Sequence, residues 1–178
     1  WLNNQKWTTL VVDGNHENFD HFDNFETVSF GNSEAGKIRD SIFHLKRGNI
    51  YDLNGYKCLT FGGADSIDKR SRIPGISWWP REIASFKETE HAIDTLIENN
   101  WHVDFVFTHT GPTTIIKELF KNDIFLKDPV SDFLDIILKK TIFRSCYFGH
   151  LHFEQRNIRN SNFSGDFNIL FDEIIQIA

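Results

Sequence analysis

The sequence predicts an α/β fold, because short apolar runs alternate with stretches whose apolar residues recur at helical spacing. This order favours a sheet with at least some parallel strands. Asn54-Gly55 separates two of the apolar runs and is typical of a two-residue hairpin turn, since both positions readily adopt positive φ. The chain has 178 residues, enough for a substantial core, and we expect a single domain over residues 1–178.

The expected strands are short runs of β-branched and aromatic residues bounded by turn residues. They lie at 8–13, 42–45, 50–53, 56–61, 103–108, 144–148, 167–171 and 174–177. Helices are expected over 87–99 and 113–120, the first because its apolar residues form one stripe. Asp128-Pro129 predicts the start of a further helix, with an N-cap acceptor followed by proline at the first helical position. Segment 64–80 is expected to be a loop rich in charged and turn residues.

Composition narrows the classes of partner. The formal net charge of −6 leaves no basic footprint, so charge does not indicate a nucleic-acid partner. No run approaches the roughly 18 apolar residues of a membrane span, so we expect no membrane association. Cys58 and Cys146 are far apart and lie in apolar surroundings, which predicts buried free thiols in a reducing cytoplasm.

Polar side chains that can bind metal follow three of the predicted strands. Asn15 and His16 follow the first, His109 follows strand 103–108, and His150 and His152 follow strand 144–148. Ligand sites in open α/β sheets lie beyond the carboxyl ends of the strands, so these side chains are expected to converge. A single histidine after a strand is more often a surface residue, but the same arrangement occurs three times here.

The His-x-His segment is a useful chelate. Residues i and i+2 of extended backbone point the same way, so both imidazoles are expected to serve one metal or two adjacent ones. Imidazole suits Zn, Fe, Ni and Mn in mixed nitrogen and oxygen sites. Gly149 precedes the pair and is expected to allow a close backbone approach or unusual dihedral angles.

Three segments in this order resemble the calcineurin-like metallophosphoesterase superfamily: Gly14-Asn15-His16-Glu17, Phe107-Thr108-His109-Thr110-Gly111-Pro112 and Gly149-His150-Leu151-His152. The superfamily pattern is GNH[DE], a histidine after a strand, and GHxH, and the resemblance covers essentially the whole chain. It implies a layered α-β-β-α sandwich with mixed sheets. It also implies a phosphatase-type hydrolase acting on phosphomonoesters or phosphodiesters.

The resemblance implies a role for each matching residue. Asn15, His109 and His150 are similar to the ligands of the second metal of a binuclear centre, and His152 to a ligand of the first. His16 resembles the general acid that protonates the leaving oxygen, and Glu17 the carboxylate that orients it. The implied cofactors are two divalent ions, expected to be Mn²⁺ with Fe, Zn or Ni as alternatives, and the implied nucleophile is a metal-activated hydroxide.

The chain departs from the superfamily pattern in one respect. The pattern also contains an earlier GDxH and a GD segment, which supply carboxylates including a bridging Asp, and the sequence has neither. The chain starts at Trp1 and contains no Met, so an N-terminal strand–helix–strand piece is expected to be missing. Asp13, Asp65 and Asp104 are alternative carboxylates, although nothing in their sequence positions favours them.

Loop 64–80 is the candidate substrate-binding segment. Arg70 and Arg72 are expected to bind substrate phosphate and Trp79 to stack on a ring, whereas the alternative is a solvated loop with its Trp residues packed on the core. Two further functions stay open beside the binuclear enzyme. One is a catalytically incomplete relative that acts as a protein-binding module, and the other is a mononuclear hydrolase using Asn15, His109 and His150.

Overall fold

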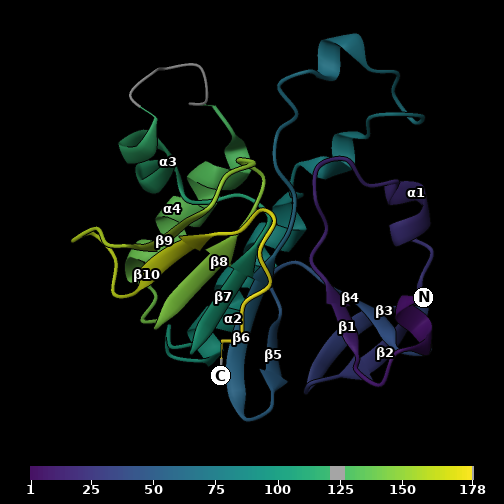
Figure 1. The fold of residues 1–178 in the computed structure, drawn as a ribbon, viewed down its shortest axis with the longest axis horizontal. Helices are drawn as coiled ribbons and strands as arrows, with labels where there is room; N and C mark the ends of the chain where they lie inside the picture. Colours follow the sequence, from purple (N-terminus) through teal and green to yellow (C-terminus); the bar gives the residue numbers. More distant parts are fainter. Residues whose placement is uncertain (121–126, 178) are drawn as a thin grey trace.

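The computed structural model describes residues 1–120 and 127–177, which form two mixed sheets and confirm the predicted α/β class (Figure 1). The smaller sheet has the strand order β1 (Thr9–Val11), β4 (Ile42–Leu45), β3 (Ser33–Arg39) and β2 (Glu26–Phe30). The larger sheet has the order β5 (Ile50–Leu53), β6 (Tyr56–Phe61), β7 (Phe105–Thr108), β8 (Ser145–Phe148), β10 (Asp166–Ile169) and β9 (Gln155–Ile158). The hairpin at Asn54-Gly55 joins β5 to β6 as predicted.

Parallel pairing in the larger sheet places the carboxyl ends of β6, β7 and β8 side by side. Strands β6, β7, β8 and β10 are parallel, as the alternation of strands and helices predicts. Phe61 pairs with Thr108, and Thr108 pairs with Phe148, so the last residues of β6, β7 and β8 lie in register. The chain therefore leaves all three strands at the same edge of the sheet, where His109 and Gly149 come next.

The helices begin where capping residues allow. Helix α2 (Phe86–Glu98) starts with a capping box in which Ser85 and Glu88 satisfy each other's backbone N–H groups. Helix α4 (Pro129–Lys140) starts at Asp128, whose carboxylate accepts from Val130 N, as the Asp-Pro pair predicts. Helix α3 (Thr113–Leu119) also lies where it was expected, and α1 (Phe19–Phe22) is a single additional turn.

The main core lies between one face of the six-stranded sheet and helices α2 and α4. Leu96 of α2 and Leu134 of α4 are fully buried in the same cluster as Val106 and Phe148 of the sheet. A second, smaller cluster of Ala35, Leu45 and Tyr51 joins the two sheets. Within the described residues, none of the helices has the length and apolar character needed to cross a membrane.

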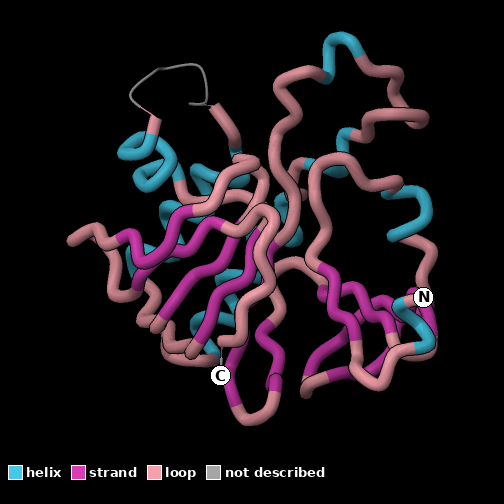
Figure 2. The backbone as a smooth tube through the Cα atoms, in the orientation of Figure 1, coloured by secondary structure: helices cyan, strands magenta, loops and turns pink. Residues whose placement is uncertain are grey.

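One expected strand is absent, and three observed strands were not expected. Segment 174–177 forms no strand; Ile174 is fully exposed in a loop that runs across the front of the larger sheet in Figure 1. Strands β2, β3 and β9 were not predicted, because Glu26–Phe30, Ser33–Arg39 and Gln155–Ile158 are largely polar and contain no apolar run. These three strands are visible in the tube view, where the loop over 63–80 rises well clear of both sheets (Figure 2).

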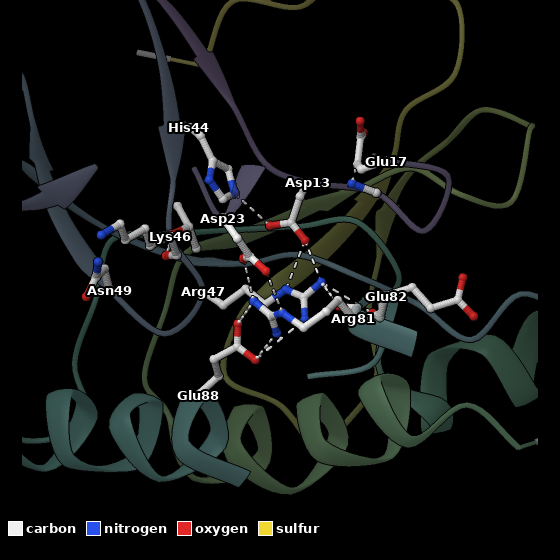
Figure 3. A network of polar contacts seen from close by, with 12 residues as sticks. Asp13, Glu17, Asp23, His44, Lys46, Arg47, Asn49, Arg81, Glu82 and Glu88 are labelled. Atoms are coloured by element: carbon white, nitrogen blue, oxygen red, sulfur yellow. Dashed lines mark hydrogen bonds and ion pairs between the residues drawn. The ribbon is translucent and has the colours of Figure 1, made fainter. Parts of the chain in front are cut away.

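A buried ion pair joins the end of β1 to the segment between β4 and β5. The Arg47 side chain is 3% exposed and donates from Nε and Nη2 to Oδ2 of Asp13, at 2.9 and 2.6 Å. Asp13 Oδ1 also contacts His44 Nε2 at 3.0 Å (Figure 3). Burial raises the pKa of Asp13, but His44 and the Arg47 charge outweigh it and hold the pKa below its ordinary value of 3.8.

Two consecutive glycines make room for this pair. A Cβ atom on Gly62 would lie 2.2 Å from Asp13 Oδ1, and one on Gly63 would lie 2.2 Å from the Glu82 carbonyl oxygen and 2.8 Å from Arg47 Nη2. Gly63 also has a φ of +85°, which disfavours any other residue. The Gly62-Gly63 break after β6 therefore serves the close approach of the buried charges.

We predict that Arg47→Met lowers the free energy of unfolding by about 3 kcal/mol or more, because it leaves the Asp13 carboxylate buried without its cation. Chemical denaturation at neutral pH measures this. Lys37→Met is the matched control, since it removes the Lys37–Asp40 pair, whose side chains are 36% and 87% exposed, and should cost about 0.5 kcal/mol or less. The difference from wild type should shrink on acidification, because removing Arg47 raises the pKa of the buried Asp13 carboxyl and the variant then takes up the proton at a higher pH than wild type does. Equal losses in the two variants would contradict the role of Arg47.

Candidate functional site

Three loops meet beyond the carboxyl ends of β1, β7 and β8. They supply His16, His109, His150 and His152, which all line one cavity of about 500 Å³. Strands β7 and β8 end in register, so His109 and Gly149 lie side by side. Gly149 N donates to the His109 carbonyl at 3.0 Å. The sequence-predicted clusters therefore converge on one place.

Asn15, His109 and His150 all line this cavity and contact one another, and we call them the trio. Asn15 Oδ1 lies 2.9 Å from His109 Nε2, and His109 Nε2 lies 3.1 Å from His150 Nδ1. Because an amide oxygen only accepts, His109 Nε2 carries the proton of this contact. Two ligands bonded to one ion at about 2.1 Å and at a right angle lie about 3.0 Å apart, so both separations fit a shared metal.

Both histidines of the trio stay neutral at neutral pH. Burial, and then the neighbouring His150, lower the pKa of His109 from 6.5 to about 4. Burial, followed by His152 and His16, also lowers the pKa of His150. Metal binding requires neutral imidazole, so the burial of this site favours the ligand form of both rings.

The His150-Leu151-His152 backbone is not extended. His150 and His152 have φ angles of +66° and +57°, in the left-handed region that residues other than glycine seldom occupy. The expectation that extended backbone sends both imidazoles the same way is therefore wrong. His150 faces His109, whereas His152 is exposed and its ring stacks on Phe171 with centroids 5.4 Å apart. The unusual dihedral angles are at the histidines, while Gly149 has no positive φ.

His16 lies beside the trio. Its Nε2 is 3.4 Å from Asn15 Nδ2 and 3.5 Å from Arg72 Nη2. Arg72 is itself held by Asp68, to which its Nε and Nη2 donate at 2.8 and 2.7 Å. The Glu17 carboxylate accepts from Gly14 N at 3.2 Å, so among the described residues its hydrogen bond goes to the loop backbone rather than to His16.

Arg70 and Trp79 are not brought to the cavity. Arg70 is exposed on the short 3₁₀ helix η2 (Lys69–Ser71), and Trp79 is buried at 8% exposure with the rest of the core. Of the predicted substrate-binding residues, the structure places only Arg72 next to a cavity histidine.

The alternative carboxylates are engaged elsewhere. Asp13 is paired with Arg47, Asp65 contacts Lys69, and Asp104 accepts from Lys57 N at 2.9 Å and pairs with Arg144. Across residues 1–120 and 127–177, no three side chains of His, Cys, Asp or Glu are grouped as metal ligands. The trio is not a group of this kind, because it contains only two histidines and its third proposed ligand is the Asn15 amide.

Two residues near the trio were not identified from the sequence. Ser66 is 1% exposed, and its Oγ accepts from Asn15 Nδ2 at 2.9 Å. Glu82 is fully buried and bonds Ser66 in turn. Both lie in or just after loop 64–80. This segment is rich in charged and turn residues, so its polar side chains were expected to be solvated.

We predict that metal-free protein becomes less stable as the pH falls from 6.5 towards 4. The unfolded chain binds a proton on His109 near pH 6.5, but the folded chain does so only near pH 4, so protonation favours unfolding throughout this window. The loss is at most about 1.4 kcal/mol per pH unit for this group. His109→Gln should flatten the dependence, as followed by chemical denaturation at a series of pH values. An NMR titration that places the His109 pKa near 6.5 would contradict the prediction.

Comparison with known proteins assigns no family to the chain. No family model matches the sequence, and no curated protein matches it either. The case for a function therefore depends on the ordered motifs and on the geometry of the residues that they bring together.

Proposed function

We propose that the chain is a metal-dependent phosphoesterase, in which Asn15, His109 and His150 bind a divalent cation. The observation that carries this proposal is the meeting of the Asn15 amide oxygen with the two imidazoles, at 2.9 and 3.1 Å, from three loops far apart in the sequence. A mixed oxygen and nitrogen donor set of this kind suits Mn²⁺, with Fe, Zn and Ni as alternatives.

The donor set carries no charge. No carboxylate belongs to the trio, so the bound ion would keep its full charge for an anionic substrate. Such ions supply two kinds of chemistry when bound, activation of a water molecule and neutralisation of charge on phosphate oxygens. Binding through Nε2 also requires the neutral His109 ring to change tautomer, so that its proton is carried by Nδ1 and the Nε2 lone pair faces the ion.

His16 and Arg72 are the proposed substrate-facing residues. Asn15 Nδ2 and Arg72 Nη2 are both donors, so His16 Nε2 accepts in the substrate-free arrangement. A bound phosphate would draw the Arg72 guanidinium onto its oxygens, and its negative charge would favour a proton on His16 Nε2. His16 then holds the proton that the leaving oxygen needs, as a general acid.

The position of His152 favours a second candidate, a mononuclear hydrolase. The His152 ring stacks on Phe171 at an interplanar angle of 16° and is exposed, whereas the three other proposed ligands face one another. A binuclear centre would need His152 to leave this stack and join a second ion. The number of metals bound per chain separates the two candidates.

We also infer a reducing, cytoplasmic environment from the cysteines. Cys58 and Cys146 are both free and buried, and burial raises the pKa of each thiol to about 12. Thiols of this kind are inert packing residues and form no disulfide framework.

We predict that the protein hydrolyses an aryl phosphate in the presence of Mn²⁺ and that His16→Ala lowers kcat by about 100-fold or more, because the leaving oxygen loses its proton donor. Release of inorganic phosphate from phenyl phosphate measures the rate, because phenol is a poor leaving group unless its oxygen receives a proton. His21→Ala is the matched control, since it removes an exposed histidine of α1. If His16→Ala keeps wild-type kcat, the role of His16 is refuted.

We further predict that His150→Ala empties the site formed with Asn15 and His109, because it removes one of the three ligands, whereas His152→Ala leaves an ion bound at that site. Elemental analysis after Mn²⁺ loading and desalting gives the metal content per chain. A decrease from two ions to one in His152→Ala supports the binuclear centre, and one ion in both wild type and His152→Ala supports the mononuclear hydrolase. Wild-type protein that retains no metal would sink both and favour a protein-binding module.

A further inference from the structure

We infer that Glu82 and Ser66 are positioning residues that determine which end of the Asn15 amide faces the two imidazoles. The inference rests on the proposed function, because it explains why the Asn15 amide turns its oxygen, and not its nitrogen, towards the proposed metal. The residues form a buried chain from Glu82 through the Ser66 hydroxyl to the Asn15 amide, with exposures of 0%, 1% and 4%.

Glu82 fixes the Ser66 hydroxyl. Its Oε1 accepts from Ser66 N at 3.0 Å and from Trp78 Nε1 at 2.6 Å, and its Oε2 accepts from Ser66 Oγ at 2.5 Å. An ionised carboxylate only accepts, so the single hydroxyl proton of Ser66 points to Glu82. The remaining lone pairs of Ser66 Oγ can only accept.

The orientation of Asn15 follows from this assignment. Ser66 Oγ lies 2.9 Å from the Asn15 amide end, and as an acceptor it requires the Nδ2 group there. Oδ1 therefore points the opposite way, to His109 Nε2 at 2.9 Å. A flipped amide would present hydrogen atoms to the metal position and could not ligate, so the proton of one serine selects the useful rotamer.

Glu82 is anchored by the same cation that anchors the Asn15 loop. Arg47 Nη2 donates to the Glu82 carbonyl at 3.3 Å and to Asp13, which lies two residues before Asn15 (Figure 3). The Glu82 carboxylate points away from Arg47, towards Ser66. The Arg47 guanidinium therefore holds the backbone at both ends of this chain of hydrogen bonds, at Glu82 and near Asn15.

The test compares Co²⁺ binding to variants of the whole chain, measured by isothermal titration calorimetry and by the visible absorption of the bound ion. We expect Ser66→Ala to weaken Co²⁺ binding by about 10- to 100-fold and to change the absorption band, since the amide loses its fixed orientation. Ser66→Thr keeps the hydroxyl and should restore most of the affinity. Asn15→Ala and the double variant Asn15→Ala/Ser66→Ala should bind equally, because Ser66 acts only through Asn15.

Ser131→Ala is the matched control, since it removes a serine hydroxyl that is 2% exposed and bonds Thr110 and Asp128 instead. It should keep affinity within about 3-fold. Circular dichroism verifies folding, and if Ser66→Ala does not fold, Glu82→Gln replaces it, because its amide can donate to Ser66 Oγ and release the hydroxyl proton towards Asn15. A folded Ser66→Ala protein with wild-type affinity, or additive losses in the double variant, would overturn the inference.

Failure of the proposed function gives a different result. If wild type binds no Co²⁺, the metal centre is refuted, and the orientation of Asn15 is then tested without metal by the side-chain amide resonances of Asn15 in ¹H–¹⁵N spectra. Ser66→Ala should shift those resonances and speed their exchange with water, while Ser131→Ala should leave them in place. Unchanged Asn15 resonances in Ser66→Ala would overturn the inference by this route as well.

Discussion

The buried Arg47–Asp13 pair is the constraint on which the arrangement of the site depends. A single guanidinium, 3% exposed, contacts the end of β1 through Asp13, the segment before α2 through the Arg81 and Glu82 carbonyls, and α2 itself through Glu88 at 3.8 Å. Burying a charge this deeply costs free energy unless the charge is paired, so these contacts offset the cost of burying Arg47. The loop that carries Asn15 and His16 therefore has little freedom to move relative to the larger sheet.

Much of this architecture follows from local sequence. The strands β4, β5 and β6 were predicted at their observed bounds because each is an apolar run ended by Gly, Asn or a charged residue. The meeting of His109 and His150 followed from parallel strands whose carboxyl ends share one edge, whereas Asn15 reaches them from the end of β1 in the smaller sheet. The start of helix α4 was predicted from Asp128-Pro129, since this pair both caps the first turn and presets its dihedral angles.

The remainder depends on contacts that no short segment encodes. Ser66 and Glu82 carry no signal, because a serine and a glutamate in a charged loop are usually solvated and only the closed fold buries them. The left-handed backbone at His150 and His152 is likewise imposed by surroundings rather than by residue preference. Strand β2 alternates, with Val28 and Phe30 half-buried and its other residues exposed, but two apolar residues in five form no apolar run from which to predict a strand.

The separation of the trio along the chain has a consequence for folding. Asn15 and His109 are 94 residues apart, and His109 and His150 are 41 apart, so no segment shorter than residues 15–150 contains all three donors. The loops between them must close before the donors meet, which makes the trio a late event with a high entropic cost. A cation with affinity for the trio would accordingly have no counterpart site in the unfolded ensemble and would raise the free energy of unfolding by mass action. An ion bound by three side chains would then stabilise the native state of the whole chain.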